Sequence, residues 1–219
     1  MITQGSPEWF LQRLGKCTAS RVADVIAKTK SNGYSASRDN YATELVLERI
    51  TGARQESYSN TAMQWGTDNE PHARAAYEAL TGAIVEEVGM LDHPTIDMSG
   101  ASPDGLVDSN GMIEIKCPNS ATHLKTLLSG LPDNRYITQM MWQMACAGRA
   151  WCDFVSYDPR FPEDIQLFVV RVNRDDVMIK SLEGEVVLFL QGVSNSVDNL
   201  RKIIEVTKTV KLNIQSMEI

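Results

Sequence analysis

The sequence predicts an α/β protein in which a small mixed sheet is flanked by helices. Three observations lead to this fold class. Helical periodicity fills the chain up to Leu80, short apolar runs of strand type dominate 84–117, and helical and strand patterns alternate after that. The 219 residues contain no repeat, low-complexity tract or linker. We therefore expect one domain, 1–219, with 175–219 forming a C-terminal helical region packed on it.

Two short helices are expected first. Ser6 is a good N-cap and Pro7 fits the first helical position, so a helix begins there and ends near Gly15. A second helix covers 21–27 and carries valine and isoleucine on one face. The polar, turn-rich segment 29–37 then predicts a loop.

Longer helices follow over 39–51, closed by Gly52, and over 67–80, before Gly82. Pro71 is tolerable in the second of these because it falls in the expected first turn. The rest of the chain alternates between the two patterns. We expect strands over 84–91, 100–107 and 112–117, helices over 120–129 and 133–147, strands over 152–157 and 165–172, and a helical stretch over 175–211 that is broken near Gly192.

The most informative segment is a predicted hairpin with charged residues on both strands. Asn110-Gly111 lies between apolar runs and is typical of a two-residue turn with positive φ at both positions. Asp104 then lies on or just before one strand, and Glu114 and Lys116 lie on its antiparallel partner. Side chains alternate along a strand, so Glu114 and Lys116 share one face and Ile115 takes the other.

This charged face suits phosphodiester hydrolysis. Mg²⁺ binds through one or two carboxylates, several waters and substrate phosphate oxygens, and it can activate a bound water. A neighbouring lysine can orient that water or stabilise developing negative charge. The alternative is a solvated hairpin with one salt bridge, because alternating charges also mark an exposed strand face.

Composition restricts the classes of protein to which the chain can belong. A net charge of −7 argues against a broad basic surface that grips DNA. The four cysteines show neither metal-ligand spacing nor a disulfide framework, so reduced thiols are expected. No apolar run approaches ~18 residues and the N-terminus lacks a basic signal region, so we expect a cytoplasmic protein without a membrane span.

The Asp…Glu-x-Lys arrangement resembles the PD-(D/E)XK nuclease core, and the surrounding sequence resembles the phage lambda exonuclease family, the YqaJ-like viral recombinases. The resemblance extends from residue 6 to about 172 and implies a restriction-endonuclease-like core. Five stretches in family order carry it: Glu8-Trp9 through Gly15; Thr18-Ala19-Ser20; Trp65-Gly66 through Arg74; Ser102 through Pro118; and Tyr136 through Gln139.

The resemblance also implies a catalytic set. Asp104 and Glu114 would be metal ligands with the Ile115 carbonyl as a third, and Lys116 would position the attacking water. Glu70 would be an extra carboxylate near a second metal position, although an acid is favoured in a first helical turn anyway. The amide of Gln139 would reach into the same site, where the alternative is a solvent-facing polar residue.

A second implied site is a pocket for the 5′-terminal phosphate, formed by Arg13, Ser20 and Ser102. A guanidinium offers forked donors to phosphate oxygens, and hydroxyl groups add more. Otherwise these residues end a helix, cap a helix and begin a strand. Met63 matches the position of an apolar wedge between base pairs, with a core methionine as the alternative, and Lys30 matches a basic loop residue on the duplex, with a solvated lysine as the alternative.

Taken together, the resemblance implies a Mg²⁺-dependent 5′→3′ exonuclease, with Mn²⁺ able to substitute. It would resect one strand of duplex DNA from an end and leave a 3′ single strand for recombination by single-strand annealing. It would form a ring-shaped homotrimer and work with a phage-type single-strand annealing protein. Two alternatives stay open: a structure-specific or restriction-like endonuclease on the same core, and a catalytically weak DNA-end-binding module.

Overall fold

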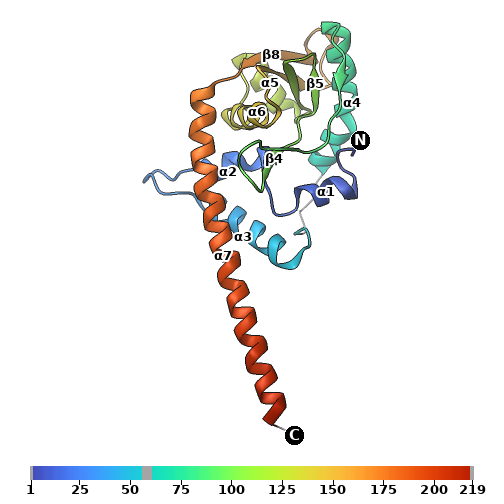
Figure 1. Ribbon diagram of the computed structural model, residues 1–219. Helices are drawn as coiled ribbons and strands as arrows, with labels where there is room; N and C mark the ends of the chain where they lie inside the picture. Colours follow the sequence, from blue (N-terminus) through green and yellow to red (C-terminus); the bar gives the residue numbers. More distant parts are fainter. Residues whose placement is uncertain (1, 56–60, 218–219) are drawn as a thin grey trace.

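The computed structural model describes residues 2–55 and 61–217, with side chains described up to residue 209. A mixed α/β body carries one long C-terminal helix that extends well beyond it (Figure 1). The elements in chain order are α1 (Pro7–Arg13), β1 (Cys17–Thr18), η1 (Ala19–Arg21), α2 (Val22–Ile26), α3 (Ala36–Thr51), α4 (Thr61–Thr81), β2 (Val85–Glu86), β3 (Leu91–Asp92), β4 (Ser99–Ala101), β5 (Gly105–Val107), β6 (Gly111–Lys116), α5 (Ser120–Ser129), α6 (Asn134–Ala147), β7 (Trp151–Tyr157), η2 (Glu163–Ile165), β8 (Leu167–Asn173) and α7 (Asp176–Met217).

The main sheet has five strands in the order β2-β5-β6-β7-β8. Strands β6 and β7 are parallel and the other neighbours are antiparallel, so the predicted mixed sheet is confirmed. A second sheet, in the order β1-β4-β3, was not foreseen because its strands are only two or three residues long. Its strands β3 and β4 pack against α6, and β4 also contacts η1.

Helices cover both faces of the central strand β6. Met112 belongs to a core cluster with α6, whereas Ile113 and Ile115 belong to a cluster with Ala73 and Tyr77 of α4. Residues 111–115 are consequently all buried. The carboxylate of Glu114 on this strand therefore lies inside the protein, between the sheet and α6.

The expected strand over 100–107 is two strands in different sheets. Strand β4 pairs with β1 and β3, and β5 pairs with β2 and β6, so Ser102, Pro103 and Asp104 form the crossing between the sheets. The expected strand over 84–91 likewise yields only β2 and the first residue of β3. This crossing is what brings Asp104 beside β6.

The predicted hairpin forms, but its predicted turn is wrong. Val107 pairs with Gly111, so the loop consists of residues 108–110, and the positive φ belongs to Asp108 (50°). Gly111 lies in the strand, where a Cβ would overlap the indole ring of Trp151. The glycine is therefore required by close packing rather than by turn geometry.

Helix α4 begins by Thr61, earlier than the predicted start at 67, so Pro71 lies inside the helix instead of in its first turn. Helix α7 is one continuous helix of 42 residues, and the predicted break near Gly192 is wrong. A helical glycine costs only about 1 kcal/mol relative to alanine. Packing of the flanking helix against the body, which buries Phe189 and Val193, outweighs that cost.

The C-terminal region packs on the domain only in part. The apolar stripe of α7 is buried from Ile179 to Val197, whereas every residue from Asp198 to Thr209 is exposed. The later part of α7 projects away from the body (Figure 1). Among the helices of the described residues, none is long and apolar enough to cross a membrane.

Candidate active site

The hairpin brings Asp104 and Glu114 to one place. Gly105 pairs with Ile113, which sets Asp104 opposite the start of the Glu114–Lys116 segment. Asp104 Oδ2 accepts a hydrogen bond from the backbone N–H of Ile115 at 2.6 Å. The backbone of β6 thus holds one carboxylate beside the other.

Glu114 is fully buried and both of its oxygens are engaged. Lys116 Nζ donates to Oε1, and Gln139 Nε2 donates to the same oxygen at 2.6 Å. Gln143 Nε2 donates to Oε2, also at 2.6 Å. Two glutamines one turn apart on α6 therefore grip a carboxylate that has no exposed surface. This arrangement excludes the alternative of a solvated hairpin with a single salt bridge.

Burial and neighbouring charges shift the pKa values of Asp104 and Lys116. Burial and the nearby Glu114 both raise the pKa of Asp104. Burial alone would lower the pKa of Lys116, but Glu114 and Asp104 outweigh it and raise that pKa. One ammonium thus faces two carboxylates in a partly buried site, and a divalent cation would relieve the remaining repulsion.

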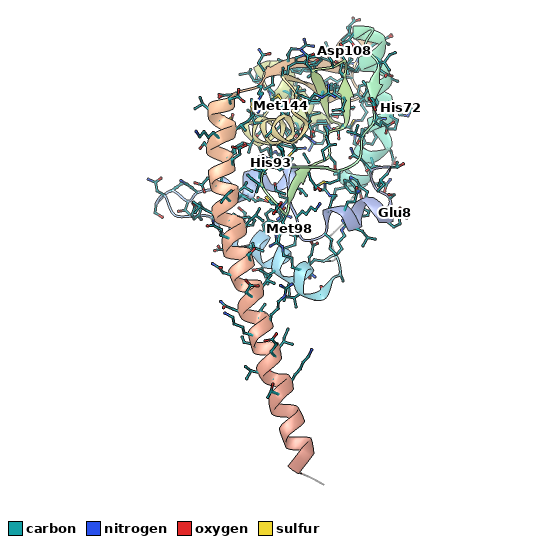
Figure 2. All side chains as sticks on the ribbon, viewed as in Figure 1. Glu8, His72, His93, Met98, Asp108 and Met144 are labelled. Carbon is teal, nitrogen blue, oxygen red and sulfur yellow. The ribbon has the colours of Figure 1, made fainter. Side chains whose placement is uncertain are left out.

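The donor set fits Mg²⁺ better than a soft transition metal. No group of three or more histidine, cysteine or acidic side chains in the described part of the chain has metal-binding geometry. A cation here would rely on Asp104, Glu114, backbone oxygen and water, which is what Mg²⁺ accepts. The Ile115 backbone reaches the site through its bond to Asp104, and its carbonyl stays a predicted ligand. His72 on α4 and the centrally placed His93 lie well apart (Figure 2).

Glu70 of α4 lies near this set but has its own partner. Its Oε1 accepts from Arg74 Nη2 at 2.9 Å. Burial raises the pKa of Glu70, Lys116 lowers it and Glu114 raises it further, so these groups lie within electrostatic reach of one another. A role near a second metal position stays a prediction.

Arg13, Ser20 and Ser102 are brought together as predicted. Arg13 donates to Ser102 Oγ at 3.4 Å and to Thr18 Oγ1 at 3.3 Å, and Thr18 Oγ1 lies 3.5 Å from Ser20 Oγ. The guanidinium lies 4.2 Å from the centre of the Trp9 ring, and Trp9 Nε1 donates to Ser102 at 2.9 Å. These donors form a preorganised cluster of one cation and three hydroxyl groups.

The two clusters share a cavity of about 160 Å³. Its lining includes all three predicted phosphate-binding residues, the Asp104/Glu114/Lys116 set and both glutamines of α6. Trp9, Arg13 and Ser20 also line an adjoining cavity of about 770 Å³. A terminal phosphate and a scissile bond can thus be held side by side.

The larger cavity also contains Met63 and Glu70. Met63 is 54% exposed, which excludes a core methionine at this position. Lys30 lies exposed in the loop between α2 and α3 and lines neither cavity. The structure therefore does not bring Lys30 to the site, and its contact with duplex DNA stays a prediction.

Sequence reasoning missed four residues of the site: Gln4, Trp9, Thr18 and Gln143. Gln4 Nε2 donates to the carbonyl of Pro103 at 2.7 Å and fixes the segment before Asp104. Only Gln143 left a signal, because it follows Gln139 by four residues and must lie on the same helical face. The others reach the site through contacts between distant parts of the chain.

Comparisons with known proteins identify the family and the fold of this chain. The family model described as the YqaJ-like viral recombinase domain matches residues 8–150. An alkaline exonuclease from Laribacter hongkongensis is 53% identical, with a TM-score of 0.85 over 94% of this chain and 100% of that chain. A second structure of that exonuclease, in complex with dAMP, gives 0.86 over the same shares.

A phage-related exonuclease from Haemophilus somnus 129PT is 16% identical, with a TM-score of 0.65 over 86% of this chain and 96% of that chain, and it supports the fold alone. No curated protein matches the sequence. The expected PD-(D/E)XK-type fold is confirmed. On the family match and the 53% identity, the chain belongs to the YqaJ-like viral recombinase family.

Proposed function

We propose that this protein is a Mg²⁺-dependent 5′→3′ exonuclease that degrades one strand of duplex DNA from its end. The observation that carries the proposal is one cavity lined both by Asp104, Glu114 and Lys116 and by Arg13, Ser20 and Ser102. The first group is suited to hydrolysis and the second to holding a terminal phosphate. A similar exonuclease binds dAMP, which belongs to the class of product expected here.

The reaction adds water to a phosphorus atom and breaks its bond to the O3′ of the terminal nucleotide. It releases a deoxynucleoside monophosphate and leaves a new 5′-phosphate on the shortened strand. Lys116 orients the water and supports negative charge developing on the phosphoryl oxygens. Asp104, Glu114 and the Ile115 carbonyl would hold Mg²⁺, which supplies Lewis acidity and a more acidic water, and Mn²⁺ would substitute. Gln139 keeps Glu114 in place, with Glu70 as an outer carboxylate.

The polarity follows from the phosphate pocket. The guanidinium of Arg13 and the hydroxyls of Ser20 and Ser102 would bind the 5′-phosphate, so that the next phosphodiester bond lies beside Asp104. Cleavage regenerates a 5′-phosphate, which can re-enter the pocket after the strand advances. Met63 would part the terminal bases and Lys30 would follow the duplex, and the product is a 3′ single strand ready for annealing.

The test compares a closed circular duplex with the same DNA linearised, in the presence of Mg²⁺. We expect only the linear form to decay, and only when Mg²⁺ or Mn²⁺ is added. Cutting of the circle would instead identify the endonuclease alternative. Loss of neither form, with retention of linear DNA on the protein, would identify a DNA-end-binding module.

We also propose a ring-shaped homotrimer around the duplex, with a phage-type single-strand annealing protein as partner in a cytoplasmic reaction. A net charge of −7 disfavours a monomer that tracks DNA by surface attraction, so sustained digestion requires enclosure.

Light scattering of the protein should give a mass near three chains. When competitor DNA is added after loading, digestion should continue as salt rises, because a topological link does not depend on counterion release. A monomer mass, or release after a few nucleotides, would contradict the ring.

A further inference from the structure

Gln143 is the buried polar group of the site that the hydrolysis chemistry does not use. It has no exposed surface and lies on the face of α6 that faces the core, next to Trp142 and Met144. Burying an amide without hydrogen bonds destabilises a fold. A buried amide of this kind normally has hydrogen-bond partners for its polar atoms.

The orientation of the Gln143 amide is determined by its neighbour. Its Nε2 lies 2.6 Å from Glu114 Oε2, and a flipped amide would set two acceptor oxygens against each other. Gln139 and Lys116 engage the other carboxylate oxygen. With only these two contacts the carboxylate could still turn about Oε1. The hydrogen bond from Gln143 to Oε2 therefore fixes the orientation of the carboxylate.

The carbonyl oxygen of the same amide lacks a partner among the described residues. Gln143 Oε1 is buried and accepts no hydrogen bond from any of them. Gln143 also lines the 160 Å³ cavity shared with Asp104 and Lys116, which has room for water. Phosphodiester oxygens are acceptors and cannot satisfy another acceptor, whereas water can. An acceptor at this position thus discriminates water from the DNA backbone.

We propose that Gln143 is a positioning residue with two tasks: its Nε2 fixes the carboxylate of Glu114, and its Oε1 holds a water in the catalytic cavity. The proposal rests on the proposed hydrolytic function of the site and assigns to it a residue outside the Asp…Glu-x-Lys motif. Residues that orient metal-binding groups typically change metal affinity or activity by 10–100-fold when they are replaced.

The test replaces Gln143 with methionine, which keeps the length and volume of the side chain and removes both hydrogen bonds. Thr138→Val is the matched control, because Thr138 is also buried on α6 and donates to the carbonyl of Asn134 within the same helix. We expect Gln143→Met to weaken Mn²⁺ binding about 10-fold or more by calorimetry. Its kcat on linear duplex should fall with KM for DNA nearly unchanged, while Thr138→Val behaves like the parent.

The second measurement is a crystal structure of the parent protein that shows ordered water. A water within hydrogen-bonding distance of Gln143 Oε1 is expected, and an empty position there would overturn the second task. Unchanged Mn²⁺ affinity and kcat in folded Gln143→Met would overturn the first. A parent protein that binds Mn²⁺ but cuts no DNA would contradict the proposed function, and the titration would still decide the role of Gln143.

Discussion

Replacing Arg13 with alanine tests the phosphate pocket most directly. Arg13 makes no ion pair within the described residues, whereas Lys16, Arg21 and Arg74, which line the same larger cavity, all do. Its two hydrogen bonds to hydroxyl groups are long, at 3.3 and 3.4 Å. A phosphate can therefore engage this guanidinium without displacing a carboxylate.

The size of the effect follows from the hydrogen bonds that the guanidinium would donate to the phosphate. A hydrogen bond to a charged group contributes about 1.5–3 kcal/mol, and each 1.4 kcal/mol is a factor of ten in rate. Burial also lowers the pKa of Arg13 somewhat, but a guanidinium stays charged at any working pH. With Ser20 and Ser102 still present, Arg13→Ala should slow digestion of a 5′-phosphorylated duplex by about 10- to 100-fold.

The assay measures the first turnover on two duplexes that differ only in a 5′-phosphate or a 5′-hydroxyl group. The parent should prefer the phosphate, and Arg13→Ala should remove most of that preference while leaving the hydroxyl substrate nearly unaffected. Arg13→Lys should be intermediate because it keeps charge but loses the forked donors and the stacking on Trp9. Arg201→Ala, on an exposed part of α7, is the control. Equal rates of the parent on both substrates would refute the pocket.

Four further outcomes are expected. Lys116→Ala should keep or strengthen Mn²⁺ binding, since it removes a positive charge, yet lose most activity; digestion at the parental rate would exclude its catalytic role. Folding raises the pKa of Asp104, so the metal-free protein loses stability as pH rises from the ordinary pKa of an aspartate to the raised one. The gain in Tm caused by Mg²⁺ should therefore grow with pH over this interval, and a gain that shrinks would contradict this. Gly111→Ala should cost about 1–3 kcal/mol in chemical denaturation because its methyl group would overlap Trp151, and an unchanged midpoint would argue against that packing. A chain ending at Asn199 should keep its Tm within about 2 °C, since the residues from Leu200 to Thr209 are all exposed; a large drop would reveal a contact between copies.

The proximity of the two carboxylates could be predicted from sequence because their approach is local. Asp104 and Glu114 are joined by a short hairpin, and strand alternation alone sets Glu114 and Lys116 on one face. The burial of that face could not be predicted, because it depends on α6 arriving from later in the chain. Gln143 contacts Glu114 from 29 residues away in sequence, and its spacing from Gln139 places it on the same helical face without showing which strand that face meets.

The wrong predictions of a tight turn and of a helix break also come from contacts between distant parts of the chain. Asn110-Gly111 has the composition of a tight turn, but the glycine is there because Trp151, forty residues later, packs against its Cα. Gly192 has the composition of a helix break, but the packing of α7 against α2 and α3 decides its conformation. Each error comes from a local preference of less than a few kcal/mol that a tertiary contact overrides.

The charges of the site also explain how an acidic protein can act on DNA. One buried carboxylate, Glu114, and one half-buried carboxylate, Asp104, face a single lysine, and a divalent cation would supply the missing positive charge and attract the scissile phosphate. Arg13, which has no acidic partner among the described residues, supplies the second attraction at the strand end. Both attractions act within one cavity of about 160 Å³, and neither requires a basic surface. The net charge of −7 is therefore compatible with a nuclease that recognises the end of a strand rather than the length of a duplex.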